Sequence, residues 1–220
     1  MFGRFCKRFI DIAVSLGLLL FTWPIMLLTA LCILLEDGFP VIFVQERVGQ
    51  SGRPFRIMKF RSMKVNQQTV AEIGQIHGTD HHLLLRVGKA IRRLKIDELP
   101  QLFNILSGQM SLIGPRPTVQ TSIDALEPFQ RRRLEAKPGV TGWAQINGNI
   151  EVSWADRAHL DVWYIDHWSL WLDIRILVAT VWVVVFGEKP NSRVIDEAKA
   201  HAERVQRSSS KGPNNAESTA

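Results

Sequence analysis

Residues 12–35 read IAVSLGLLLFTWPIMLLTALCILL, a run of 24 positions without a charged side chain between Asp11 and Glu36. About 20 apolar residues are enough for a helix to cross the hydrocarbon core of a bilayer. A buried helix of a soluble protein seldom stays uncharged over such a length. A cleaved signal peptide does not fit either, because the apolar run is too long and no small-x-small cleavage site follows it. We therefore expect this segment to lie in lipid.

Two features bear on whether the segment crosses the membrane. Pro24 lies near its middle, where it removes a backbone hydrogen bond and clashes with the preceding turn, so a kink is expected. Basic residues flank both ends: Arg4, Lys7 and Arg8 before it, and Arg47, Arg53, Arg56, Lys59, Arg61 and Lys64 after it. The positive-inside tendency would keep both flanks in the cytoplasm. A helix that enters the membrane, bends and returns places both basic flanks in the cytoplasm, whereas a straight crossing places only one flank there. The residues alone do not decide between these two topologies.

Composition limits the classes of function. The chain has 220 residues, 46% of them hydrophobic, which suits one domain, or one domain plus an appendage, and excludes a bundle of many spans. Its two cysteines, Cys6 and Cys32, cannot form a disulfide scaffold or a four-ligand zinc site. The net charge of +6 favours an acidic partner: nucleic acid, anionic lipid or a phosphorylated small molecule. Residues 1–64 carry nine Lys and Arg against four Asp and Glu, so most of the excess surrounds the apolar segment.

Short elements follow the apolar segment. Residues 41–45 and 55–63 are predicted strands, with a turn at residues 49–52 between them. Residues 65–82 are polar and irregular. They contain His77, His81 and His82, but no carboxylate or cysteine stands at ligand spacing, so a solvated loop is favoured over a metal site. Residues 83–94 could form a basic amphipathic helix.

A carboxylate pair opens the next predicted helix. In Lys95-Ile96-Asp97-Glu98-Leu99-Pro100-Gln101, Asp97 is a candidate N-cap, and Pro100 is tolerated only within the first turn. The predicted apolar face of this helix consists of Leu99, Leu102, Phe103 and Leu106, and the helix is expected to end at Gly108. The pair by itself is most simply an acidic helix start. Adjacent carboxylates can also hold Mg²⁺ and provide a nucleophile, and Arg92, Arg93 and Lys95 just upstream would attract phosphate oxygens.

Two further motifs are more specific. Gly114-Pro115-Arg116-Pro117 fixes a turn around one arginine, an arrangement that suits a guanidinium aimed at a ligand. Residues 137–148, KPGVTGWAQING, combine tight-turn dipeptides with an aromatic ring and two amides. Asn147-Gly148 on its own is a strong hairpin signal.

The C-terminal part suits an interfacial protein. Trp143, Trp154, Trp163, Tyr164, Trp168, Trp171 and Trp182 lie there, and such rings favour either the lipid head-group level or an aromatic core. Residues 176–186 are apolar but too few to span a bilayer. Arg131-Arg132-Arg133 is predicted to be a solvated helix face, with contact to anionic lipid as the alternative. From about Arg193 the chain becomes polar, and residues 208–220 are expected to be disordered.

With these motifs in this order, the chain resembles the bacterial sugar transferases, monotopic phosphoglycosyl transferases that act on polyprenyl phosphate. The resemblance covers roughly residues 4–187. It rests on Lys7-Arg8, Gln45-Glu46-Arg47-Val48-Gly49, Lys59-Phe60-Arg61-Ser62-Met63, Asp97-Glu98-Leu99-Pro100-Gln101-Leu102, residues 114–117 and 137–148, and Asp161, Tyr164, Ser169 and Asp173.

The resemblance implies an α+β, mainly helical monotopic membrane protein with amphipathic interfacial helices and a small β-hairpin. Residues 1–38 would be a re-entrant, kinked membrane helix, residues 39–190 the catalytic domain, and residues 191–220 a polar, partly disordered tail. The implied location is the inner (plasma) membrane of a bacterium. The catalytic domain would face the cytoplasm and contact anionic lipids of the inner leaflet.

The resemblance also implies an activity, the transfer of a sugar-1-phosphate from a UDP-sugar to undecaprenyl phosphate with release of UMP. This reaction would initiate assembly of a lipid-linked glycan. Asp97 would be the nucleophile and the Mg²⁺ ligand, forming a phosphosugar–aspartyl intermediate, and Glu98 would handle the proton of the lipid phosphate. The implied substrate-binding residues are Lys59, Arg61, Arg92, Pro115, Arg116, Gln145 and Asn147.

The sequence departs from the family pattern at three places. Thr22-Trp23-Pro24 replaces a common Ser before the kink proline, and the Thr22 hydroxyl is a candidate partner for a carbonyl that the proline frees. Residues 80–86 and Asn149 also differ, which weakens any inference about the donor sugar. A non-catalytic membrane scaffold is the alternative. A nucleic-acid binder is disfavoured because the positive excess flanks a lipid segment and no base-reading module is recognised. The oligomeric state is left open, a homodimer included.

Overall fold

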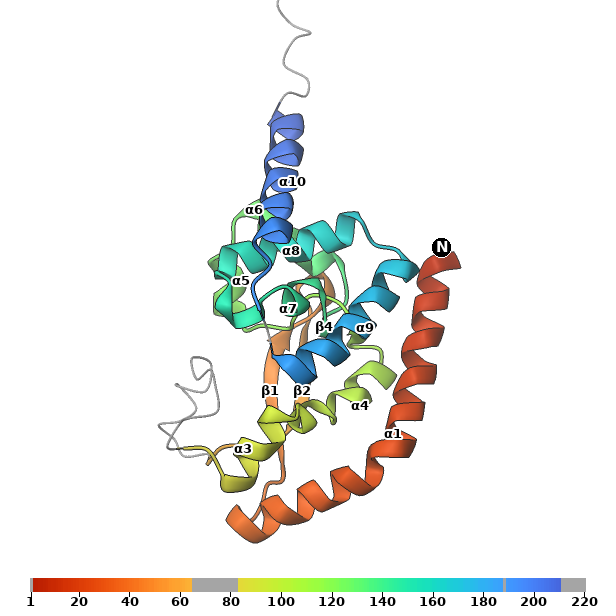
Figure 1. The fold of residues 1–220 in the computed structure, drawn as a ribbon, viewed down its shortest axis with the longest axis vertical. Helices are drawn as coiled ribbons and strands as arrows, with labels where there is room; N and C mark the ends of the chain where they lie inside the picture. The colour runs from red at the N-terminus through yellow and green to blue at the C-terminus, as the bar shows by residue number, and fades with distance from the viewer. Residues whose placement is uncertain (1, 65–82, 188, 211–220) are drawn as a thin grey trace, which may run out of the picture.

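The computed structural model describes residues 2–64, 83–187 and 189–210 (Figure 1). The loop predicted for residues 65–82, with its three histidines, lies outside these ranges. The described chain is mainly helical and contains two sheets of two short strands each. The predicted α+β, mainly helical class is therefore confirmed.

The apolar segment lies within α1 (Phe2–Asp37), a helix of 36 residues that bends midway along its length (Figure 1). Pro24 lies inside it and has no N–H, so the carbonyl of Leu20, four residues earlier, loses its helical donor. The Thr22 hydroxyl donates to the carbonyl of Leu18 at 2.7 Å. The expected kink is present, but Thr22 bonds a different carbonyl from the one that Pro24 frees.

Both arms of α1 are bonded to the rest of the chain. Arg8 donates to the carbonyls of the last two residues of α4 (Gln101–Leu106) at 2.6 and 2.9 Å. The buried carboxylate of Asp11 accepts from the Ser111 hydroxyl and the Leu112 N–H, both at 3.0 Å. At the other end, Glu36 accepts from the first two backbone N–H groups of α3 (Arg86–Arg93) at 2.6 and 2.9 Å. The membrane-type helix is thus part of the packed body.

Two small sheets provide the scaffold. β1 (Ile42–Val48) and β2 (Pro54–Phe60) form an antiparallel hairpin around a 3₁₀ turn at Gln50–Gly52. β3 (Ser111–Ile113) and β4 (Gly139–Thr141) pair in parallel. The predicted hairpin is confirmed, although its first strand extends three residues further than expected and its second strand ends three residues earlier.

The remaining helices lie mostly beside and above these sheets, and α10 projects away from them at the top of the view (Figure 1). They are α5 (Gln120–Asp124), α6 (Pro128–Arg131), α7 (Trp143–Ile146), α8 (Trp154–Asp166), α9 (Leu170–Phe186) and α10 (Ser192–Ser210), with 3₁₀ turns at Ile96–Glu98 (η2), Arg132–Glu135 (η3) and Asn149–Glu151 (η4).

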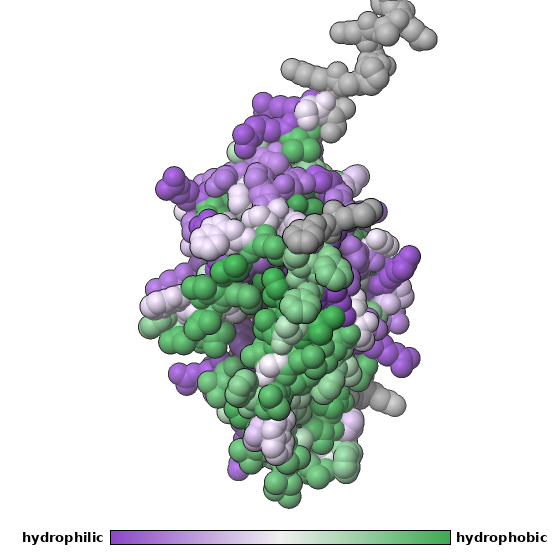
Figure 2. Space-filling model, turned by 90° about the vertical axis from the view of Figure 1, so that its right-hand side faces the viewer, coloured by the Kyte–Doolittle hydropathy of each residue, from purple (hydrophilic) through white to green (hydrophobic). Residues whose placement is uncertain are grey.

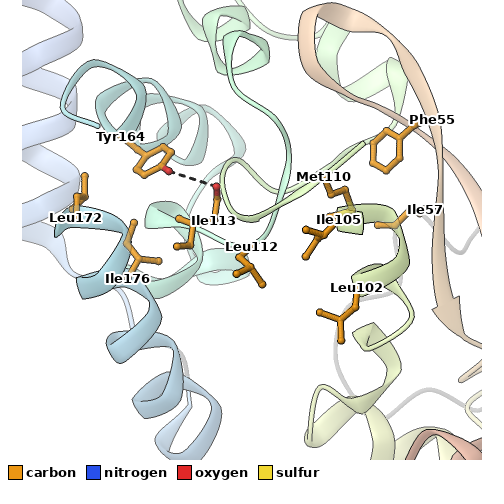
Figure 3. Packing of buried hydrophobic residues seen from close by; sticks show 10 residues of the cluster. All are labelled: Phe55, Ile57, Leu102, Ile105, Met110, Leu112, Ile113, Tyr164, Leu172 and Ile176. Carbon is orange, nitrogen blue, oxygen red and sulfur yellow. Dashed lines mark hydrogen bonds between the residues drawn. The ribbon is translucent and has the colours of Figure 1, made fainter. Parts of the chain in front are cut away.

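The main core joins β2, α4, β3, α8 and α9 (Figure 3). It contains Phe55, Ile57, Leu102, Ile105, Met110, Leu112, Ile113, Tyr164, Leu172 and Ile176. The predicted apolar face of α4 is only partly right, because Phe103 is 47% exposed whereas Ile105 is fully buried. Asn104 also turns inward, since its amide accepts from Met58 N–H at 3.0 Å and donates to the Arg56 carbonyl at 2.7 Å. These bonds hold α4 against β2, so the buried face of α4 is rotated from the one that the sequence predicted.

A large apolar surface covers the side of the molecule formed by α1 and α9 (Figure 2). Leu20, Phe21 and Leu27 of α1 are more than half exposed, as are Val181 and Trp182 of α9. Within the described ranges, α1 is the helix that is long and apolar enough to cross a membrane. Burying so much exposed apolar area requires a lipid or protein neighbour.

A helix occupies much of the polar C-terminal part of the chain. Residues 192–210 form α10, which packs on α8 through the buried Ala198 and Ala202. The helix includes residues 208–210, for which disorder was expected. Residues 211–220 lie outside the described part of the chain.

Candidate active site

The carboxylate pair lies on its own 3₁₀ turn rather than at the start of α4. Lys95 adopts a left-handed conformation (φ 57°), η2 follows, and α4 begins only after Pro100. The predicted N-cap role of Asp97 is therefore wrong, because Pro100 occupies the N-cap position and separates the turn from the helix. The turn frees the Asp97 side chain to line a cavity.

Glu98 is buried in an ion-pair cluster. Its Oε1 accepts from Arg116 at 2.6 Å and from Lys59 Nζ at 3.1 Å. Burial alone would raise the pKa of Glu98, but the charges and hydrogen bonds of Arg116 and Lys59 outweigh it and hold the pKa well below its usual range. Burial lowers the pKa of Lys59, and the charge of Glu98 opposes this. Glu98 is consequently a carboxylate that positions two cations.

Asp97 has the opposite electrostatic character. Burial and the negative charge of Glu98 raise its pKa to about 6, against the opposing charges of Lys59, Arg92 and Arg116. Two adjacent carboxyl groups thus have pKa values pushed apart, which is common where the two have different chemical tasks. Burial and the charge of Glu98 thus outweigh the three cations that favour the ionised form of Asp97.

Arg116 is held by the predicted rigid turn. The Gly114 N–H donates to the Thr141 carbonyl and the Gly139 N–H donates to the Pro115 carbonyl, each at 2.9 Å, which locks the turn between β3 and β4. A Cβ atom at Gly114 would collide with the Lys137 carbonyl, so the close approach requires glycine. The interpretation of this motif as a device that aims one guanidinium agrees with the structure.

A cavity of about 540 Å³ opens beside Asp97. Its walls come from β1, β2, α3, η2, α4, α5, η3, α7, η4 and α8, together with the turn that carries Arg116. The basic residues that line it are Arg47, Lys59, Arg61, Arg92, Lys95, Arg116, Arg133 and Arg157, whereas the acidic ones are Asp97 and Asp161. Such a lining suits a ligand that carries several negative charges, and phosphate groups above all.

The structure brings most of the predicted site residues together. Lys59, Arg61, Arg92, Asp97, Arg116 and Gln145 line the cavity, and Glu98 is bonded to two of them. Arg61 also has a structural task, because it donates to the carbonyls of Asp37 and Gly38 at the end of α1.

Two predicted residues lie away from the cavity lining. Pro115 supports the Arg116 turn through its carbonyl. Asn147 donates to the Trp143 carbonyl at 2.8 Å and ends α7, so Asn147-Gly148 does not form a hairpin. Gly148 has φ 124° and leads into η4. This positive φ accounts for glycine at the position, so no hairpin is needed to explain it.

Sequence reasoning missed the opposite wall of the cavity. Arg133 and Asp161 form a buried ion pair at 2.8 Å, each side chain 3% exposed, so the solvated face predicted for the three arginines is wrong at Arg133. Burial raises the pKa of Asp161, and Arg133 opposes this. Trp154 and Arg157 lie beside the pair. Trp154, Arg157 and Asp161 are spaced three and four apart on α8, a periodicity that could have indicated one shared face.

Asp97 suits a particular kind of metal site. Among the residues that the structure describes, no group of three or more His, Cys, Asp or Glu side chains could hold an ion. Mg²⁺, however, is commonly held by one or two carboxylates and completed by water and substrate phosphates. A single carboxylate beside a large basic cavity fits this pattern, whereas Oε1 of Glu98 already accepts from two cations.

Comparison with known proteins places these residues in a family. The family model described as "Bacterial sugar transferase" matches residues 2–187. The "Uncharacterized sugar transferase EpsL" of Bacillus subtilis (strain 168) is 43% identical over 182 residues, which are 83% of this chain and 88% of that protein.

Two longer relatives have more informative names. The "UDP-N-acetylgalactosamine-undecaprenyl-phosphate N-acetylgalactosaminephosphotransferase" of Aeromonas hydrophila is 43% identical over 194 residues, 83% of this chain and 44% of that protein. The "Undecaprenyl-phosphate glucose phosphotransferase" of Komagataeibacter xylinus is 43% identical over 193 residues, 82% of this chain and 36% of that protein. The match thus spans less than half of these two relatives. Because the family model covers most of the chain, α1 and the Asp97 cavity included, the chain belongs to the bacterial sugar transferase family.

Proposed function

We propose that the chain is a phosphoglycosyl transferase that moves a sugar-1-phosphate from a UDP-sugar to undecaprenyl phosphate and releases UMP. The observation that carries the proposal is the Asp97 carboxylate, set in a basic cavity beside Lys59, Arg92 and Arg116. The names of the relatives support the class of reaction. The product would be the first lipid-linked intermediate of a glycan.

The first half-reaction uses Asp97 as a nucleophile. A carboxylate oxygen of Asp97 attacks the phosphorus that bears the sugar, the bond from this phosphorus to the bridging oxygen breaks, and UMP leaves with the bonding electrons. The sugar phosphate remains on Asp97 as an acyl phosphate. Arg92 and Arg116 stabilise the charge that spreads over the phosphoryl oxygens.

The second half-reaction regenerates the carboxylate. A phosphate oxygen of the lipid attacks the same phosphorus, the bond to Asp97 breaks, and the sugar diphospholipid is released. Two half-reactions suit a soluble donor and a membrane-bound acceptor, because each can bind in turn. Glu98 orients Lys59 and Arg116 throughout; its lowered pKa makes it a poor proton acceptor while these contacts last.

Mg²⁺ is the proposed cofactor. Asp97 and the diphosphate of the donor would hold it, and it would neutralise phosphate charge during transfer. The remaining positive charge comes from the chain itself, through Lys59, Arg92 and Arg116.

The proposed location is the inner membrane, with the cavity on the cytoplasmic side. The exposed apolar surface of α1 and α9 would lie in the bilayer (Figure 2). Basic residues next to α1 would contact anionic head groups of the inner leaflet. This arrangement brings the lipid phosphate to the cavity while the prenyl chain stays in hydrocarbon.

Activity is tested with the membrane-extracted full chain. UMP release would be measured with Mg²⁺, undecaprenyl phosphate and a panel of UDP-sugars. We expect release with at least one donor and a loss of 10³-fold or more in Asp97→Asn, on the order expected when a nucleophile is removed. Asp124→Asn, a change at an exposed carboxylate outside the cavity, is the matched control. Release by Asp97→Asn at the wild-type rate would refute the mechanism.

The covalent intermediate has a separate test. With the lipid acceptor withheld, intact-protein mass spectrometry should detect the added mass of one sugar phosphate. Peptide mapping should locate it on Asp97. An adduct on another residue would reassign the nucleophile.

Topology is tested by labelling. In a chain whose Cys6 and Cys32 are replaced by Ser, single cysteines at Arg4 and Ser51 should react from the same side of the membrane. Labels on opposite sides would mean that α1 crosses the bilayer.

A further inference from the structure

One end of the cavity has no task in the steps above. It is formed by Arg133 of η3 and by Trp154, Arg157 and Asp161 of α8, here called the Trp154 cluster. The charges acting on Asp97 are those of Glu98, Lys59, Arg92 and Arg116, whereas those acting on Arg157 are Arg133, Asp161 and Arg116. Arg116 is common to both sets, so it lies between two separate charged regions of one cavity.

Within the cluster, Arg133 and Arg157 differ in their pairing. Arg133 is neutralised by Asp161 and also donates to the Arg116 carbonyl at 2.9 Å, so its place in the fold is fixed. Arg157 is half-buried, and its Nε is a buried donor for which the described residues offer no acceptor. Leaving such a donor without a partner is costly, and a bound anion would supply the acceptor and offset the like charges of Arg133 and Arg116.

Trp154 supplies a ring of fixed orientation at the same place. Its Nε1 donates to the Ser122 carbonyl at 3.0 Å, and the guanidinium carbons of Arg133 and Arg157 lie 4.7 and 5.1 Å from its ring centroid. Tryptophan and guanidinium planes are the groups on which proteins stack nucleobases. A second unpaired atom, Oε1 of Gln145, is buried on another residue of the lining and can accept a hydrogen bond from a base or ribose.

We propose that the Trp154 cluster binds the nucleoside monophosphate part of the donor, with Arg157 on its phosphate and Trp154 against its base. This assignment rests on the proposed function and adds to it the direction in which the donor lies. The sugar phosphate is at Asp97, Arg116 lies between the two phosphates, and UMP leaves from the α8 end.

The position of the cluster favours the soluble donor over the lipid acceptor. α8 packs against α10 and α6 in the polar part of the molecule, and it is its C-terminal end, at Tyr164, that bonds α9, whereas the cluster begins at its N-terminal end (Figures 1 and 2). An acceptor whose prenyl chain stays in lipid approaches from the apolar surface of α1 and α9. A water-soluble nucleotide can enter from the polar side.

The test is direct binding of UMP to the full chain in detergent, measured by calorimetry without any sugar donor. Arg157→Gln should weaken UMP binding about tenfold or more, the effect of losing one charge-assisted hydrogen bond. The same change should leave uridine binding nearly unaltered, whereas Trp154→Leu should weaken both ligands. Arg193→Gln makes the same charge change at an exposed position of α10 and should bind UMP as the wild type does.

Steady-state kinetics then separates donor from acceptor. Arg157→Gln should raise the KM for the UDP-sugar and leave the KM for undecaprenyl phosphate unchanged. A raised KM for the lipid alone, or unaltered UMP binding in both variants, would overturn the proposal. Orthophosphate is the second probe: Arg157-dependent binding of orthophosphate as tight as that of UMP would also overturn it, because the base would then contribute nothing. If UMP binding depended on Arg157 but the wild-type chain had no transferase activity, the subsite would stand and the proposed function would be refuted.

Discussion

Replacing Asp97 with Asn should stabilise the protein at neutral pH. Burial and the charge of Glu98 raise the pKa of Asp97 to about 6 from an ordinary value of 3.8. A carboxyl group whose pKa is higher in the folded than in the unfolded state stabilises the fold while it is protonated. This contribution is complete below about pH 3.8 and is lost as the pH rises through about 6. Asn cannot ionise and therefore avoids the loss.

The size of the effect follows from the pKa difference. Each pKa unit corresponds to about 1.4 kcal/mol, so the charged Asp97 costs up to about 3 kcal/mol above pH 7. Its partial exposure makes this an upper value. For a chain of this length, a gain of that size raises Tm by roughly 6 to 12 °C.

The assay is thermal unfolding in detergent at several pH values, with EDTA so that no divalent cation neutralises the carboxylate. Asp97→Asn should exceed the wild type in Tm at pH 8, and the difference should shrink as the pH falls from 6 to 4. Asp124→Asn should follow the wild type throughout. A less stable Asp97→Asn at pH 8, or a difference independent of pH, would refute the reasoning about the carboxylate pair.

Three further changes test other parts of the molecule. Arg133→Leu leaves Asp161 buried without its partner and should lower the free energy of unfolding by about 3–5 kcal/mol in chemical denaturation; if adding Asp161→Leu recovered none of this loss, the pairing would be doubtful. Glu98→Gln removes a charge that raises the pKa of Asp97, so the acid limb of the pH profile of UMP release should move to lower pH, and an unmoved limb would contradict the coupling. Ala202→Asp puts a charge into the contact between α10 and α8 and should lower Tm by several degrees. Ala200→Asp makes the same change at an exposed position of α10 and should leave Tm unchanged.

Local signals were sufficient for the features that depend on neighbours in the sequence. The length of the apolar run and Pro24 predicted α1 and its bend, and alternating residues around Gly49 and Gly52 predicted the hairpin. The Arg116 turn was predicted because two prolines and a glycine restrict the backbone whatever surrounds them. The resemblance then brought Asp97 into the same candidate site.

Features that depend on distant partners could not be predicted in the same way. Three consecutive arginines are typical of a solvated face, and only Asp161, 28 residues later on α8, explains why Arg133 is buried. Asn104 turns inward because β2 offers backbone groups that no helical pattern contains. The polar composition of α10 likewise gave no sign that Ala198 and Ala202 are buried, although their small side chains allow close packing on α8.

The bonds of Asp11 have a consequence for the chain that follows α1. Its carboxylate is the buried acceptor for two donors at β3, so in a chain without α1 these donors would have to bond to water and this part of the interior would open to solvent. The part of the chain that follows α1 is therefore not expected to keep the same packing on its own. A defect in α1 should therefore also appear as a loss of packing at β3.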